Sequence, residues 1–159
     1  MKYLDFLKKH KLALFAAAVI GIICIAPQVI FQISLGSGYK GIYLMQTANE
    51  LDYLGRIQEI KDGHFTLSSV SFLEYKDRPA LMPPNILEIL AAVISLVWGV
   101  SVSSIVILSK FFLPSLLFLL IYFFVHRLTE NQESLTNKIN AIGAGMLIVL
   151  GYDLIDYRS

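Results

Sequence analysis

Two acidic residues, Glu50 and Asp52, stand close enough together to do chemistry. A carboxylate beside a substrate can act as a general base, and carboxylates also bind divalent cations. The same acids have a structural explanation. Asn49 is a favourable N-cap residue, and acids in a first helical turn gain about 0.3–1 kcal/mol each from the helix dipole. The spacing alone leaves both roles open.

Cationic side chains follow these acids and could bind a phosphate through charge-assisted hydrogen bonds. Each could equally be a solvated charge at an interface, and Arg56 could instead pair with Asp52 at i−4. The cationic residues of this region are Arg56, Lys61, His64, Lys76 and Arg78.

The acids and the first cations belong to a predicted amphipathic helix over residues 49–61. One side of this helix carries Glu50, Tyr53, Leu54, Ile57 and Lys61, and another side carries Asp52, Arg56 and Glu59. Asp62-Gly63 is a typical turn and ends the helix. A helix of this kind can lie along a membrane surface.

The composition indicates a membrane protein. Hydrophobic residues make up 56% of the 159-residue chain and charged residues 16%, against about 25% charged in a typical soluble domain. The net charge of +1 gives no reason to expect nucleic acid as a partner. The lone Cys24 lies in an apolar run as a small filler, and no Cys and His residues have the spacing of metal ligands.

Four apolar runs predict an all-α, polytopic helical membrane protein with about four transmembrane helices, at 12–35, 80–99, 102–126 and 139–155. The first run exceeds the h-region of a signal peptide, so we expect an uncleaved helix. The second begins early enough to place Pro83 and Pro84 in its first turn. The fourth contains Gly143, Gly145 and Gly151, which suit close helix packing.

The flanking charges predict the orientation. Lysines at positions 2, 8, 9 and 11 precede the first run, which places the N-terminus in the cytoplasm by the positive-inside rule. Residues 36–79 then form a long extracytoplasmic loop that carries the 49–61 helix. Four alternating spans place Arg127 and Lys138 outside, a mild violation of the same rule.

Residues 49–65 read NELDYLGRIQEIKDGHF and resemble the first outer loop of the GT-C superfamily of membrane glycosyltransferases, protein O-mannosyltransferase or aminoarabinose-transferase type. Residues 99–128 resemble the connection between the second and third spans of that family. The positions that carry the resemblance are Asn49-Glu50, Tyr53, Arg56, Asp62-Gly63-His64, Lys110, Pro114 and Arg127-Leu128.

The resemblance implies sugar transfer from a polyprenyl-phosphate donor, a membrane lipid, to an acceptor hydroxyl at the outer face of the cell membrane. It implies Glu50 as the first candidate base and Asp52 as the second, because Asn49 stands where the family has an acid and cannot be a base. The residues implied in substrate binding are Asn49, Tyr53, Arg56, Lys61, His64 and Arg78. A divalent cation is used by some relatives and not by others.

The family has many more spans than this chain, so residues 1–159 are expected to be the N-terminal membrane module of a larger glycosyltransferase, inactive alone. The alternative is a non-enzymatic membrane subunit or assembly factor that docks partner helices through Gly143, Gly145 and Gly151. A transporter or channel is disfavoured, because Glu88 and Lys110 fall near predicted span ends rather than at mid-membrane.

Overall fold

The chain is all-helical in the computed structural model, as its sequence predicts. The structure describes residues 2–41, 44, 49–65, 83–129 and 135–156, with 2–5 and 152–156 as backbone alone, and these residues contain no strand. They divide into two compact units. Unit 1 is Met1–Val29 with Ser109–Ser159, and unit 2 is Ile30–Leu108.

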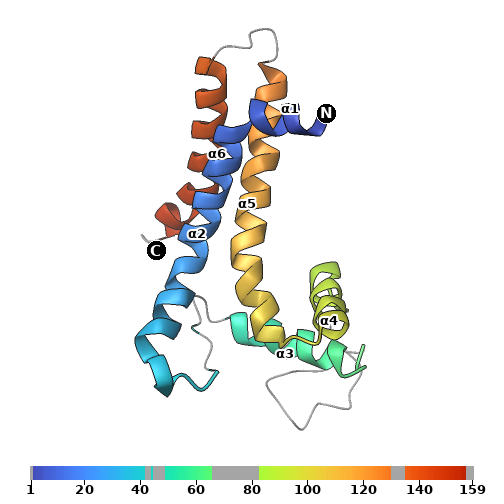
Figure 1. The fold of residues 1–159 in the computed structure, drawn as a ribbon. Coiled ribbons are helices and arrows are strands. Elements are labelled where there is room, and N and C mark those ends of the chain that lie inside the picture. Colours follow the sequence, from blue (N-terminus) through green and yellow to red (C-terminus); the bar gives the residue numbers. More distant parts are fainter. Residues whose placement is uncertain (1, 42–43, 45–48, 66–82, 130–134, 157–159) are drawn as a thin grey trace. The chain divides into compact units, whose positions relative to one another are not determined.

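Three helices form the body of unit 1 and lie side by side in Figure 1. They are the first part of α2 (Lys11–Leu35), most of α5 (Val102–Leu128) and α6 (Leu135–Asp156). Small residues in a helix face let helix backbones approach closely. Alanines supply that face here, and the core is built from Ala13, Ala16, Ala17, Ile20, Phe118, Tyr122 and Ala141.

Two glycines mark the closest helix contacts of unit 1. A Cβ at Gly21 of α2 would meet the Ser115 hydroxyl and the ring of Phe111, both on α5. A Cβ at Gly145 of α6 would lie 2.7 Å from two ring atoms of Phe118. Ser115 also joins the helices directly, because its Oγ donates to the Ala17 carbonyl at 2.9 Å.

Helix α1 (Lys2–Lys9) is turned away from the axis of α2, and the two meet at His10 (Figure 1). Helical hydrogen bonds continue through the bend, from His10 N to Phe6 O and from Leu14 N to His10 O, each at 3.1 Å. The His10 side chain is buried, and its Nδ1 lies 3.0 Å from the Tyr122 hydroxyl. This hydrogen bond fixes the α1–α2 junction against α5.

Unit 2 contains the end of α2, a short 3-10 helix η1 (Gly36–Gly38), α3 (Glu50–Lys61), α4 (Ile86–Trp98) and the start of α5. Helices α3 and α4 pack together. Their common core consists of Ile57 and Ile60 of α3, Ala92 of α4 and Val102 of α5. The amphipathic helix predicted at 49–61 is therefore confirmed as a helix.

Helix α4 begins later than the sequence pattern predicts. The described residues before it, from Pro83 to Asn85, are not helical, and positions 80–82 lie outside the described residues. A proline disfavours helical backbone in the residue before it. Asn85 instead caps the helix through a capping box, in which the Asn85 side chain accepts from the Glu88 N–H and the Glu88 carboxylate accepts from the Asn85 N–H, each at 2.9 Å.

Among the described residues, two helices are long and apolar enough to cross a membrane, Lys11–Gly38 including η1 and Val102–Leu128. These contain the predicted runs 12–35 and 102–126. Helix α4 has 13 residues, about 20 Å at 1.5 Å per residue, against a hydrocarbon core of about 30 Å. The run 139–155 lies within α6, and the part of this helix with described side chains, Leu135–Gly151, is a shorter apolar helix. A count of four membrane spans stays a prediction.

The alternating four-span path does not agree with the contacts of unit 1. That path places Lys138 on the opposite side of the membrane from the N-terminal lysines. In the structure the Lys138 Nζ lies 3.5 Å from the Lys9 carbonyl oxygen, and the His126 ring lies 5.3 Å from the His10 ring. The N-terminal lysines, the end of α5 and the start of α6 thus share one end of unit 1.

Candidate functional site

The predicted site residues lie on α3, which is docked through one face. Ile57 and Ile60 are almost fully buried against α4, and Leu54 is partly buried beside them. Tyr53 points out of this core, with 50% of its surface exposed. The core therefore fixes the position of α3, and the first turn stays accessible.

Both candidate bases lie in the first turn of α3. Glu50 is half-buried and Asp52 is exposed. Asn49 is the N-cap residue of α3, as predicted, but its side chain makes no cap hydrogen bond and its backbone is helical rather than extended. The favourable interaction of the two acids with the positive end of the helix dipole remains.

Arg56 forms an ion pair with Glu88 of α4. Its Nε lies 3.0 Å from Glu88 Oε1, and one terminal nitrogen lies 3.2 Å from Oε2. That nitrogen also donates to the Pro83 carbonyl oxygen at 3.3 Å. Glu88 is only 2% exposed, so Arg56 compensates a desolvated carboxylate. Glu88 is therefore a partner of Arg56 that the sequence analysis did not suggest; it suggested Asp52 or a phosphate.

Lys61 and His64 also have partners within unit 2. The Lys61 Nζ donates to the Val100 carbonyl oxygen at 3.3 Å, and the Ser95 hydroxyl donates to the same oxygen at 2.6 Å. His64 Nδ1 lies 3.0 Å from a carboxylate oxygen of Glu59, and this pair is more exposed than the Arg56 pair. The last turn of α3 is thereby tied to the turn that follows α4.

The structure brings most of the predicted residues together on one helix. The acidic residues and the cationic residues of this helix differ in their contacts. The acids lie in the first turn of α3, and the cations Arg56 and Lys61 anchor the helix to α4 and to the turn after it. Arg78 lies outside the described residues. Within the described part of the chain, no group of three or more His, Cys, Asp or Glu side chains could hold a metal ion.

Glu88 is the residue of this site that the sequence prediction missed. A signal for it exists, because Asn85 followed three residues later by an acid is the pattern of a capping box. That pattern places Glu88 in the first turn of a helix. It does not reveal the pairing with Arg56, which lies 32 residues earlier in the chain.

Comparison of the chain with protein families, curated proteins and solved structures finds no match.

Proposed function

We propose that this chain acts in a membrane as part of a glycosyltransferase that moves a sugar from a polyprenyl-phosphate donor to an acceptor hydroxyl. The observation that carries the proposal is the anchoring of α3. The Arg56–Glu88 ion pair holds an amphipathic helix on α4, with Glu50 and Asp52 in its accessible first turn. Accessible carboxylates on a fixed helix are what a general base requires.

The membrane setting is supported by the apolar surfaces of the helices. Large apolar side chains are exposed on α2 and α5, which are also the two helices of spanning length. Helix α4 exposes apolar side chains along its whole length, from Ile86 at 79% to Trp98 at 69%. Apolar surface of this extent is expected to face lipid or protein rather than water.

The orientation that we propose places the N-terminus and the start of α6 in the cytoplasm. With α2 and α5 as the two spans, Lys8, Lys9 and Lys11 lie at the same end of unit 1 as Arg127 and Lys138. All five charges then obey the positive-inside rule, and the violation in the four-span path disappears. Helix α3, which lies between the two spans in sequence, belongs to the outer face.

In the proposed reaction a carboxylate of α3 takes the proton of the acceptor hydroxyl. The acceptor oxygen forms a bond to the anomeric carbon of the sugar. The bond from that carbon to the lipid phosphate breaks, and the phosphate leaves with the electron pair. Glu50 is the first candidate for the base and Asp52 the second.

Arg56 is better assigned as a positioning residue than as a phosphate ligand. A phosphate could engage it fully only by leaving Glu88 buried without its counter-charge, which costs several kcal/mol. The side chain of His64 is 58% exposed in its pair with Glu59. An exposed pair of this kind contributes little to folding stability, so it can be broken at low cost. His64, with Arg78 as in the sequence prediction, is therefore the better candidate to hold the phosphate, whereas Lys61 already donates to the Val100 carbonyl oxygen.

The test is sugar transfer from a polyprenyl-phosphate donor, measured in membranes that contain the full gene product. We expect Glu50→Gln to lower the rate by about a hundredfold or more, the contribution of a general base. Asp62→Asn is the matched control, because Asp62 is an exposed acid at the other end of α3. Full activity in both Glu50→Gln and Asp52→Asn would remove the catalytic assignment.

A non-enzymatic membrane subunit is the second candidate, and α6 carries the observation that favours it. Gly143 and Gly151 have open space where a side chain would be, whereas Gly145 already packs on Phe118. Small residues in an open stretch of helix suit a partner helix. A partner that co-purifies in fixed ratio, is lost in Gly143→Leu and is retained in Gly145→Ala would support this function, provided that no sugar lipid binds.

A further inference from the structure

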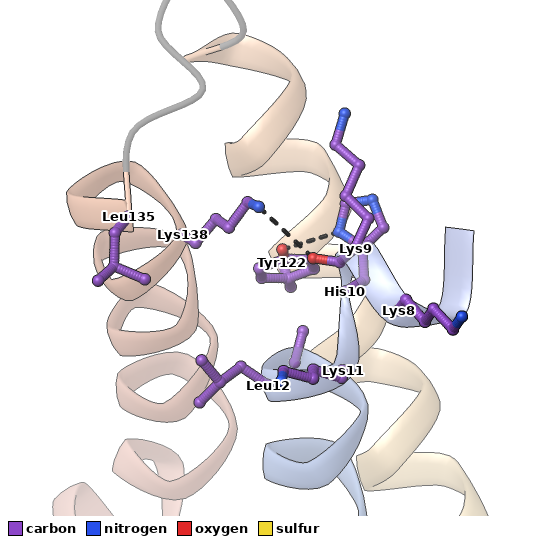
Figure 2. Close-up of a pocket in the computed structure, with 9 residues that line it drawn as sticks. Lys8, Lys9, His10, Lys11, Leu12, Tyr122, Leu135 and Lys138 are labelled. Atoms are coloured by element: carbon purple, nitrogen blue, oxygen red, sulfur yellow. Dashed lines mark hydrogen bonds between the residues drawn. The ribbon is translucent and has the colours of Figure 1, made fainter. Parts of the chain in front are cut away.

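A basic cavity in unit 1 lies apart from the residues of α3. It has a volume of about 250 Å³ and lies where the α1–α2 junction meets α5 and the start of α6. Its cationic residues are Lys8, Lys9, Lys11 and Lys138, and its apolar residues include Leu12, Ala13 and Leu135. Figure 2 shows Lys138 reaching from α6 toward the backbone of Lys9, beside the Tyr122 side chain.

Aromatic contacts surround the residue that joins α1 to α2. His10 is 5% exposed, and its ring packs against the rings of Phe6, at 4.7 Å, and Phe123, at 5.3 Å. Its hydrogen bond to the Tyr122 hydroxyl, drawn in Figure 2, ties the α1–α2 junction to α5. The backbone positions of the neighbouring lysines are therefore fixed before any ligand arrives, which lowers the entropy lost on binding.

The charges of the cavity select an anion. Lysine ammonium groups bind phosphate as point charges, and Lys138 stands in the first turn of α6, where the helix dipole adds positive potential. Lys138 is half-buried and reaches toward Tyr122 in Figure 2, while the three junction lysines are exposed, and the side chains of Lys8 and Lys9 extend away from Tyr122. A half-buried lysine is screened less by salt than an exposed one, so Lys138 should contribute most to specificity.

The apolar residues of the cavity favour an anionic ligand that also carries a hydrocarbon group. Leu12 and Leu135 border the same cavity as the lysines, and Leu12 is the second residue of a helix long enough to cross a membrane. A ligand with a phosphate head and a hydrocarbon tail would satisfy both halves. The volume is below that of pockets that enclose drug-sized molecules, about 300–1,000 Å³, so only the headgroup enters.

We propose that this cavity binds the phosphate headgroup of an anionic membrane phospholipid at the cytoplasmic surface, with Lys138 as its central cation. Basic pockets between helices on this side of a membrane are known sites for anionic headgroups. The proposal concerns unit 1 alone and does not depend on sugar transfer. It does depend on α2 and α5 crossing the membrane.

The test is native mass spectrometry of the detergent-purified full chain, titrated separately with short-chain phosphatidylglycerol, short-chain phosphatidylcholine and inorganic phosphate. We expect phosphatidylglycerol to bind at least fivefold more tightly than phosphatidylcholine. One lysine at a membrane surface is worth about fivefold in affinity, so Lys138→Gln should weaken phosphatidylglycerol binding by about that factor. Lys40→Gln, which removes an exposed lysine of unit 2, should have no effect.

A second variant separates a built site from diffuse surface charge. Tyr122→Phe keeps every charge and removes the hydroxyl that holds His10, so we expect it to weaken binding measurably, by at most about fivefold, the net worth of one hydrogen bond. Equal binding of the two lipids, or equal losses in Lys138→Gln and Lys40→Gln, would overturn the site. Binding of inorganic phosphate as tight as that of phosphatidylglycerol would overturn the assignment to a lipid.

Discussion

At the scale of single residues, Glu88 has two tasks in the structure. Its carboxylate caps the start of α4 through the Asn85 N–H and pairs with Arg56 of α3. A buried carboxylate without a counter-charge is strongly unfavourable. The stability of the α3–α4 contact therefore depends on Arg56 as well as on the apolar contacts of Ile57 and Ile60.

We expect Arg56→Ala to lower the free energy of unfolding by about 2–3 kcal/mol, because it leaves Glu88 buried and unpaired. Denaturation in mixed detergent micelles, followed by circular dichroism, measures this loss. In the double variant Arg56→Ala with Glu88→Gln no buried charge is left, so much of the stability should return. A loss in the double variant that equals the sum of the losses in Arg56→Ala and Glu88→Gln would contradict the ion pair.

At the scale of elements, α6 provides a matched pair of glycines. Gly143 and Gly145 lie in the same helix and have no unusual backbone, but only Gly145 faces a neighbour, the fully buried Phe118. An alanine in a helix interior is favoured over glycine by about 0.5–1 kcal/mol. The same change can thus stabilise at one position and destabilise two residues away.

We expect Gly145→Ala to cost about 1–3 kcal/mol, because its Cβ would force the Phe118 ring to move in a closed core. Gly143→Ala should stabilise the chain by up to about 1 kcal/mol. Thermal unfolding of the two variants in one detergent compares them directly. Equal midpoints would show that α6 does not pack on α5 through Gly145.

The helices also show how much of the fold can be predicted from the sequence. Long apolar runs determine α2 and α5, because no turn or strand pattern competes with a helix there. The local capping-box pattern of Asn85 and Glu88 predicts the start of α4 correctly. The two prolines before it suggest an earlier start. The Arg56–Glu88 pair is not readable in this way, because it joins residues 32 positions apart and depends on how α3 docks.

At the scale of the whole molecule, the number of spans between the two ends of unit 1 decides the topology. Two spans bring the chain back to the side on which it started, whereas three do not. If α2 and α5 cross a membrane as we propose, the contact between His10 and Tyr122 requires the start of α2 and the end of α5 to be on the same side of it. A prediction of membrane topology from flanking charges could not include this contact, because the two residues are 112 positions apart in the sequence.

We expect single cysteines at two exposed positions, introduced as Lys8→Cys and Thr129→Cys on a Cys24→Ala background, to react from the same side of sealed membrane vesicles. A cysteine introduced as Ser37→Cys, just after α2, should react from the opposite side. An impermeant maleimide distinguishes the two sides. If the Thr129→Cys and Ser37→Cys variants react from the same side, three membrane crossings would separate the N-terminus from residue 129, as in the four-span path.

The carbonyl oxygen of Val100 accepts hydrogen bonds from both Ser95 and Lys61. A carbonyl oxygen has two lone pairs, and here the protein itself occupies both. A peptide oxygen that needs no water molecule can be immersed below the headgroups, where an unsatisfied one costs several kcal/mol. The hydrogen bonding of the turn between α4 and α5 is therefore compatible with the membrane setting that we propose.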